Sequence, residues 1–181
     1  MFRVVVFCVA CLLIAAGPGA AQERQYLGRA TVFTNDSFGD TRDRWRTGGV
    51  QGSLLWGPEW QGRAPAVAGQ LLELRWGGQI IAPASLTRPD PRDRPNAGAL
   101  SLGLHTHFTR GAMDMALGAD LVMTGPQTGL DDLQKALHDF AGLIAPPSDA
   151  VRAAQIGNAL HPTLVFEAGS DMRLGAARQT G

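Results

Sequence analysis

The sequence has few of the features that define several large classes of protein. Its two cysteines, Cys8 and Cys11, both lie in the first apolar segment, so a chain without that segment contains no cysteine. Disulfide frameworks and thiolate metal sites are therefore excluded for the rest of the chain. After residue 21, no apolar run reaches the roughly 20 residues that a membrane-spanning helix requires.

The chain also lacks an excess of charge of either sign. It has 16 Lys and Arg residues against 16 Asp and Glu residues, and loss of the first 21 residues removes only Arg3. Nucleic-acid binding requires a concentrated basic surface, so no nucleic-acid partner is expected. No G-x-S-x-G motif occurs, and a serine hydrolase of the usual type is therefore not supported.

The N-terminus has the pattern of an export signal. A short basic start at residues 1–3 precedes an unbroken apolar run at residues 4–16, and small residues follow as far as Gln22. This pattern predicts a secretory signal peptide that is cleaved near Ala20 or Ala21. The alternative, a retained membrane anchor, is disfavoured because the run is short and ends in Gly-Pro-Gly. We expect residues 1–21 to be the signal peptide and residues 22–181 to form one domain.

The remainder of the chain alternates between apolar and polar or small residues with period two. In the clearest segment, Met115, Leu117 and Leu121 fall on one face while Asp114 and Asp120 fall on the other. Alternation of this kind predicts β-strands with one apolar and one polar face. Six such segments occur, at about residues 26–34, 47–57, 68–76, 100–108, 112–124 and 162–168.

Two architectures fit this alternation, a transmembrane β-barrel and a soluble β-sandwich. Ionisable residues in the middle of strands, such as Glu73 and Arg75, favour a barrel with a wet lumen. Trp56, Trp60 and Trp76 fall at or near strand ends, where an aromatic girdle would lie. We therefore expect an all-β, antiparallel transmembrane β-barrel with about six strands present and one short loop helix.

The predicted connections differ in length on the two sides of the sheet. Those after the first, third and fifth strands cover residues 35–46, 81–96 and 125–160, whereas those after the second and fourth cover about 57–65 and 109–111. Long loops on one rim and short turns on the other are typical of outer-membrane barrels. Because functional residues concentrate in long loops, we expect any active site on the rim with the long connections.

Residues 125–142 predict a single amphipathic helix among the strands. The helix is expected to begin at Thr128, with Asp131 as a capping-box partner, and to stop at Gly142. Gln134 and His138 are four residues apart, so they share a helical face. Histidine exchanges protons near neutral pH, which makes His138 a candidate general base. The alternative is a surface histidine without a role. The apolar stripe of the helix comprises Leu130, Leu133, Leu137 and Phe140.

Two further groups of residues could take part in chemistry. Asn35 and Asp36 end the first strand, where they either form a turn or, with the hydroxyl of Thr47, offer hard oxygen ligands to Ca²⁺. Arg88 in the third connection either holds an anionic group or is merely solvated. A histidine acting as general base on water, with a bound cation polarising an ester carbonyl, matches this set of side chains.

The remaining histidines have simpler interpretations. His105 and His107 fall on the polar face of one predicted strand, and we interpret both as structural lining of the lumen. His161 precedes a proline and is expected in a loop.

Five motifs, in order and at the right spacing, resemble those of the LpxR family of outer-membrane lipid A 3′-O-deacylases. They are residues 34–38 (TNDSF), 43–48 (DRWRTG), 78–79 (GQ) with 93–98 (DRPNAG), 118–126 (GADLVMTGP) with Gln134 and His138, and 155–158 (QIGN). The resemblance covers most of the chain after the signal segment.

The resemblance implies a twelve-stranded barrel in the outer membrane of a Gram-negative bacterium. Its activity would be hydrolysis of the 3′-linked acyl ester of lipid A, with lipopolysaccharide as substrate and the barrel-assembly machinery as a partner in insertion. The family is Ca²⁺-dependent and resembles phospholipase A2 in mechanism. By this resemblance His138 would be the general base, and Asn35, Asp36 and Thr47 would line the site and hold the metal. Arg88, or alternatively Thr87, would stand where some members have a basic residue in the third loop.

The chain departs from the family pattern at several positions. Arg46 and Asn96 replace frequent tyrosines, and Ile144 stands where one form of the family has a glutamate ligand. Six strands are half of the implied barrel, so residues 22–181 are expected to form one partial outer-membrane β-barrel domain. The alternatives to an active deacylase are therefore a non-catalytic outer-membrane barrel or binding module, and an inactive truncated product.

Overall fold

The computed structural model describes residues 24–35, 48–141 and 147–170, and for residue 35 and residues 137–141 it describes the backbone alone. The strands are β1 (Gln25–Asn35), β2 (Gly48–Gly57), β3 (Leu71–Ile81), β4 (Ala97–Arg110), β5 (Met113–Thr124) and β6 (Ala159–Gly169). The helical segments are η2 (Pro126–Thr128), α2 (Leu130–Ala141) and α3 (Asp149–Ala153). None of the helices in these ranges is long and apolar enough to cross a bilayer.

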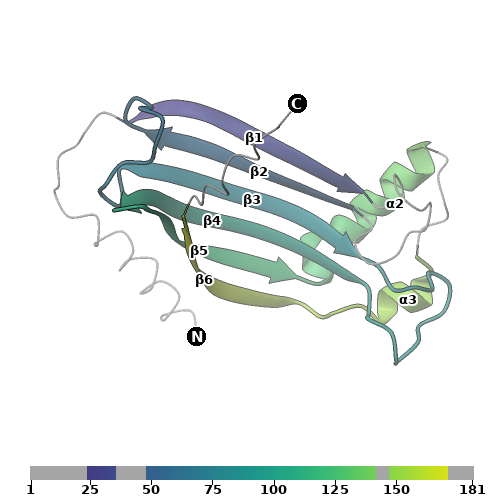
Figure 1. The fold of residues 1–181 in the computed structure, drawn as a ribbon. Helices are drawn as coiled ribbons and strands as arrows, with labels where there is room; N and C mark the ends of the chain where they lie inside the picture. The colour runs from purple at the N-terminus through teal and green to yellow at the C-terminus, as the bar shows by residue number, and fades with distance from the viewer. Residues whose placement is uncertain (1–23, 36–47, 142–146, 171–181) are drawn as a thin grey trace, which may run out of the picture.

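The six strands form one antiparallel sheet in the order of the sequence, and the sheet is open and curved (Figure 1). This confirms the all-β, antiparallel prediction, with the described strands forming a partial barrel. The predicted alternation fixes the register, because a slip of one residue would move every side chain to the opposite face. One apolar row crosses five strands without interruption, through Leu54, Leu74, Leu104, Ala119 and Leu164.

The opposite face of the sheet carries the polar side chains. The neighbouring row to the apolar one contains Ser53, Arg75, Gly103, Asp120 and Thr163. Leu104 and Leu164 on the apolar face are 48% and 85% exposed, as expected for a surface that does not face water.

An ion pair shows which face is concave. Arg75 on β3 donates to Glu167 on β6, with 2.7 Å between Nη1 and Oε1. These strands are three places apart in the sheet, about 14 Å if the sheet were flat. Side chains from β3 and β6 meet because the sheet curves toward the face on which these side chains lie. The polar face is therefore the concave face, which corresponds to a lumen, and the apolar face is convex.

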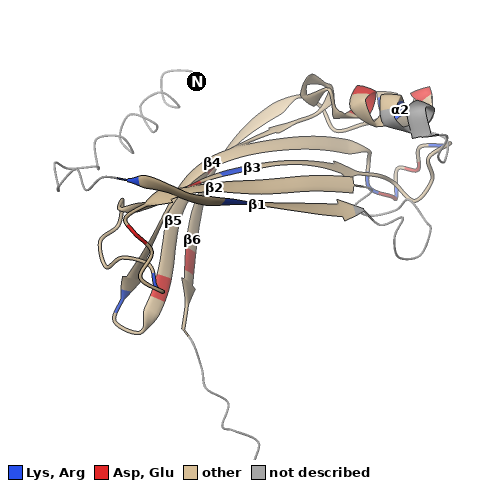
Figure 2. Ribbon diagram, turned by 90° about the horizontal axis from the view of Figure 1, so that it is seen from above, with Lys and Arg blue, Asp and Glu red and all other residues tan. Residues whose placement is uncertain are grey.

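The long connections gather at one end of the sheet. β1, β3 and β5 all end there, and the connections 36–47, 82–96 and 125–158 follow them, as predicted. α2 and α3 lie at this end (Figure 1), which we call the loop rim. Charged residues are sparse along the strands, whereas α2 carries acidic residues (Figure 2).

Several details differ from the sequence prediction. Trp76 lies in the middle of β3 rather than at its end, where its indole fills the space above Gly52. Trp56 does lie near the end of β2, with its ring centroid 6.0 Å from that of Tyr26. The connection between β2 and β3 is longer than expected, residues 58–70, and α3 was not predicted. His161 belongs to β6 rather than to a loop.

Candidate functional site

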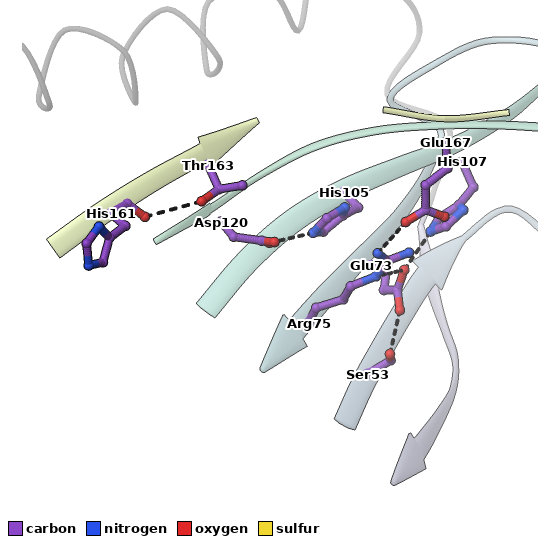
Figure 3. A network of polar contacts seen from close by, with 9 residues as sticks. All are labelled: Ser53, Glu73, Arg75, His105, His107, Asp120, His161, Thr163 and Glu167. Carbon is purple, nitrogen blue, oxygen red and sulfur yellow. Dashed lines mark hydrogen bonds and ion pairs between the residues drawn. The ribbon is translucent and has the colours of Figure 1, made fainter. Parts of the chain in front are cut away.

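The concave face carries a network of charged side chains in the middle of the sheet (Figure 3). Glu73 is its centre. Ser53 donates to Oε1 of Glu73, Arg75 Nε donates to Oε2 at 2.9 Å, and His107 Nε2 lies 2.6 Å from the same oxygen. Arg75 also reaches Glu167. We call these five residues the lumen network.

A second histidine pair lies beside the lumen network. His105, which is 1% exposed, has Nε2 at 2.7 Å from Oδ1 of Asp120. The ring fits because Gly118 beside it has no side chain, since a Cβ there would overlap the imidazole. His105 and His107 thus lie on the polar face as predicted, each held by a carboxylate from a neighbouring strand.

The lumen network contains no serine–histidine pair. Ser53 and His107 both bond to Glu73 and not to one another, so no imidazole is placed to activate the hydroxyl. Each carboxylate of the network is paired with Arg75. Side chains that pair with one another are what a structural lining of the lumen requires.

The concave face is also hollowed at the end opposite the loop rim. A cavity of about 780 Å³ there is lined by residues including Trp60, Arg63 and Glu167.

A different arrangement occurs on the convex face at the loop rim, where α2 packs. Gly78 and Gly98 belong to the apolar rows and are buried beneath the start of the helix. A Cβ on Gly98 would lie 2.7 Å from Oγ1 of Thr128 and 3.2 Å from Cβ of Leu130. A Cβ on Gly78 would lie 3.7 Å from Cδ2 of Leu130. The two glycines therefore form a seat on which α2 rests against the outer wall.

Polar side chains are buried next to this seat. Asn96 is 1% exposed and Gln134 is 5% exposed, and Asn96 Nδ2 donates to Oδ1 of Asp131 at 3.0 Å. We call Asn96, Asp131, Gln134 and Gln155 the rim cluster. Four of its atoms are buried without a hydrogen-bond partner among the described residues: Asn96 Oδ1, Asp131 Oδ2, Gln134 Nε2 and Gln155 Oε1.

Further contacts join the segments around the rim cluster. The amide of Gln127 donates to Oδ1 of Asn158 at 2.9 Å, and Arg152 pairs with Asp132 at 2.7 Å, which links α3 to α2. Ser148 caps α3 and also donates through its hydroxyl to the carbonyl of Thr87 at 3.0 Å. The connections 82–96 and 125–158 are thus tied together at the loop rim.

The predicted general base lies on α2. Position 138 is one helical turn after Gln134, and its side chain is outside the description. α2 is described as far as Ala141, and the predicted stop at Gly142 lies outside the described residues. The predicted capping box is replaced: Thr128 Oγ1 accepts from the amide of Leu130 at 3.4 Å, while Asp131 accepts from Asn96.

The predicted apolar stripe is only partly buried. Leu130 packs on the glycine seat, but Leu133 is 54% exposed while the adjacent Gln134 is buried. The helix is therefore turned so that a polar position, rather than Leu133, faces the wall.

The predicted oxygen ligands lie at the end of β1. Asn35 is the last residue of that strand. The row of paired residues that begins at Asn35 runs across the sheet through Gly48 and Ile80 to Gly98 of the helix seat. Asn35 is thus in the same row as the seat of α2. Asp36 and Thr47 lie outside the described residues. Within the described ranges, no three His, Cys, Asp or Glu residues are grouped so as to hold a metal ion.

Arg88 lies in the 82–96 connection at the same rim, and its side chain is exposed. Its amide donates to Oγ of Ser85 at 3.2 Å. Its guanidinium has no partner among the described residues. Nearby, Arg92 pairs with Asp90 and holds the pKa of that carboxyl below its ordinary value.

Sequence reasoning missed Asn96 as a site residue. Its contact with Asp131 joins positions 35 residues apart, and the sequence marked it only as a departure from the family motif. Gln134 was noted for its position on the face of His138, but its burial was not predicted.

The chain matches the family described as outer membrane protein LpxR over residues 5–172. Among solved structures, its fold is similar to that of LpxR from Salmonella typhimurium, with a TM-score of 0.59 and 20% sequence identity. That similarity covers 77% of this chain and 50% of the other, so the chain spans about half the length of this relative. None of the curated proteins gives a significant match. The chain belongs to the LpxR family of outer membrane proteins.

Proposed function

We propose that this member of the LpxR family is a carboxylic ester hydrolase that removes the 3′-linked acyl chain of lipid A in the outer membrane. The observation that carries the proposal is the seat of α2. A helix with a histidine at position 138 covers buried polar residues on the convex, lipid-facing wall, at the rim where the long loops gather. Polar groups buried on that side cost free energy, so a site for a lipid substrate explains them better than packing does.

The dimensions of the rim support the proposal. An α-helix rises about 1.5 Å per residue, so position 138 is about 12 Å along the axis from Leu130 on the seat. Asn35 is three strands from Gly98 in the same row, which corresponds to about 14 Å. The helix is therefore long enough for its C-terminal half to share a site with the end of β1.

In the proposed reaction His138 accepts a proton from water while the water oxygen bonds to the acyl carbon. The carbonyl electron pair moves onto its oxygen, giving a tetrahedral oxyanion that the guanidinium of Arg88 stabilises. When this intermediate collapses, the bond to the sugar oxygen breaks and the departing oxygen takes the proton from His138. The products are a free fatty acid and a lipid A with a free hydroxyl group at the 3′-linked position.

The oxygen donors of Asn35, Asp36 and Thr47 are the ligand types that Ca²⁺ prefers. We assign them to metal binding, and Ca²⁺, when bound, would supply positive charge near the oxyanion. Ile144 provides no ligand oxygen, so fewer protein ligands are available here than in the family form with a glutamate.

The proposal is tested with the full chain, refolded in detergent and mixed with purified lipopolysaccharide. Release of the 3′-linked acyl chain is measured by mass spectrometry in Ca²⁺ and in chelator. We expect release in Ca²⁺ that is lost in chelator and lost in His138→Ala, since a general base contributes roughly 100- to 10,000-fold to the rate.

His161→Ala is the matched control, because it removes an exposed histidine at the start of β6 whose main contact is Thr124 Oγ1 at 3.3 Å. It should retain the wild-type rate. A folded wild-type chain that releases no acyl group would favour the non-catalytic alternatives. Equal rates for wild type and His138→Ala would refute the assignment of the base.

A further inference from the structure

The apolar residues of α2 do not fix its rotation on the wall. Leu133 is 54% exposed while its neighbour Gln134 is 5% exposed. Successive residues of a helix are 100° apart, so these two side chains point in clearly different directions. On a convex face that meets lipid, burial of the leucine in place of the glutamine would gain little, because lipid tails are as apolar as leucine. Apolar burial therefore does not select the rotation, and a directional contact must set it.

The polar contact that does this begins at Asn96. Its Nδ2 donates to Oδ1 of Asp131 at 3.0 Å, and its backbone carbonyl accepts from the amide of Ile156 at 2.9 Å. Asn96 directly precedes β4, so one residue joins the sheet, the first turn of α2 and the segment before β6. A hydrogen bond has a preferred direction, whereas the contact of Leu130 with Gly78 and Gly98 restrains the helix without choosing a rotation.

We propose that Asn96, acting through Asp131, is a positioning residue that fixes the rotation of α2 on its glycine seat. Position 138 is seven residues after Asp131, close to two full turns, so it lies on nearly the same side of the helix. The contact that fixes Asp131 thereby also fixes the side on which residue 138 is presented. The catalytic part of this inference rests on the proposed function, whereas the rotation of the helix does not.

The burial of Asn96 fits a positioning role better than a stabilising one. Its Oδ1 and the Nε2 of Gln134 are both buried without a partner among the described residues. Such groups lower stability, typically by about 1–3 kcal/mol each. An apolar residue at position 96 would avoid this cost but would leave the helix free to turn.

Cysteine labelling measures the rotation without reference to activity. The full chain with Cys8→Ser and Cys11→Ser has no other cysteine, so Leu133→Cys and Gln134→Cys each introduce a single thiol. In the refolded chain, the thiol at position 133 should react with a maleimide at least roughly tenfold faster than the one at position 134, because the latter reacts only when the helix opens locally. After Asn96→Ala the two rates should converge.

Three further variants make the test specific. Asp131→Ala breaks the same contact from the helix side and should have the same effect, which also covers a failure of Asn96→Ala to fold. The exchange Asn96→Asp with Asp131→Asn restores a donor and an acceptor and should recover the difference between the rates. Arg152→Ala removes a different side-chain contact of the first turn, the ion pair with Asp132, and should leave the rates unchanged.

Labelling and hydrolysis together separate the two proposals. Where the wild type hydrolyses lipid A, Asn96→Ala should lower kcat at least tenfold with little change in KM, and the exchange should restore it. A shift in labelling without any hydrolysis in the wild type would uphold the positioning role and remove the proposed function. A rate difference that persists in folded Asn96→Ala and Asp131→Ala would overturn the positioning role.

Discussion

The lumen network and the rim cluster are both polar groups on one sheet, but they differ in how they are satisfied. On the concave face, Glu73 meets Ser53, Arg75 and His107, and beside this network only His105 Nδ1 is buried without a partner among the described residues. On the convex face, the rim cluster holds four buried atoms without partners in the described part of the chain. The side chains of the lumen network satisfy one another and need no further partner. The unpaired atoms of the rim cluster lower stability, which indicates a role other than packing.

The two regions also differ in their surroundings. The lumen network lies on strands, where the pleat alone fixes each side chain. The rim cluster is assembled from the start of β4, the first turns of α2 and the segment before β6, all joined by long connections. We therefore expect substitutions in the lumen network to change stability and substitutions at the rim to change activity.

Outside the proposed catalytic residues, the largest effect should come from Gly98→Val, which breaks the seat of α2. A branched side chain there would collide with Thr128 and Leu130, because even a Cβ would lie 2.7 Å from Thr128 Oγ1. Displacement of a catalytic helix by about 1 Å can cost roughly 100-fold in rate. We expect lipid A hydrolysis to fall about 100-fold while gel migration of the unheated protein, which reports the folded sheet, is retained. A variant with unchanged kcat/KM would show that the seat does not set the site.

Glu73→Ala should have the converse effect. It leaves Ser53 and His107 without their acceptor, whereas Arg75 keeps its pair with Glu167. Because Glu73 is buried and its partners are only partly so, we expect a loss of about 2–3 kcal/mol in the free energy of unfolding. Urea titration of the detergent-refolded chain measures it. Activity per folded molecule should be unchanged, and its loss would place chemistry in the lumen.

Gly118→Ala should destabilise the sheet by a smaller amount. The added methyl group would overlap the His105 ring and push it away from Asp120. Overpacking of this kind typically costs about 1–3 kcal/mol, and we expect the lower half of that range because Asp120 is partly exposed and can follow. The same titration checks it. A more stable variant would mean that the His105 contact is not a native restraint.

The smallest effect is expected at Asp90, which pairs with Arg92 in the 82–96 connection. Arg92 lowers the pKa of Asp90, so any stabilisation is present above the ordinary aspartate pKa and is lost as pH falls through the lowered value. The pair lies at the surface and is screened by solvent, so Asp90→Asn should give the wild-type profile of stability against pH. A profile that separates from wild type on the acid side would show that this loop contributes to folding.

The sheet was predictable because its signal is local. Alternation at residues 112–124 assigns Leu117 and Asp120 to opposite faces, and the observed register keeps them there. The position of the long loops followed from strand parity alone. The start of β3 and the short helix α3 were missed, since neither has a pattern longer than a few residues.

The candidate site was predictable only in part. The sequence identified the helix with position 138 and the end of β1, and the register puts Asn35 in one row with Gly98. It did not identify Asn96, because the partner of that residue is 35 positions away. It also assigned Leu133 to the buried stripe, since periodicity ranks residues by hydrophobicity and cannot include a directional contact made elsewhere.

The most direct test exchanges one histidine in each region and follows release of the 3′-linked acyl chain from lipopolysaccharide in Ca²⁺. We predict that His138→Ala on α2 reduces kcat/KM at least roughly 100-fold. His107→Ala, which removes the lumen histidine bound to Glu73, should keep the activity per folded molecule near that of wild type. Loss of activity in His107→Ala with retention in His138→Ala would contradict the account and move the chemistry from the rim to the lumen.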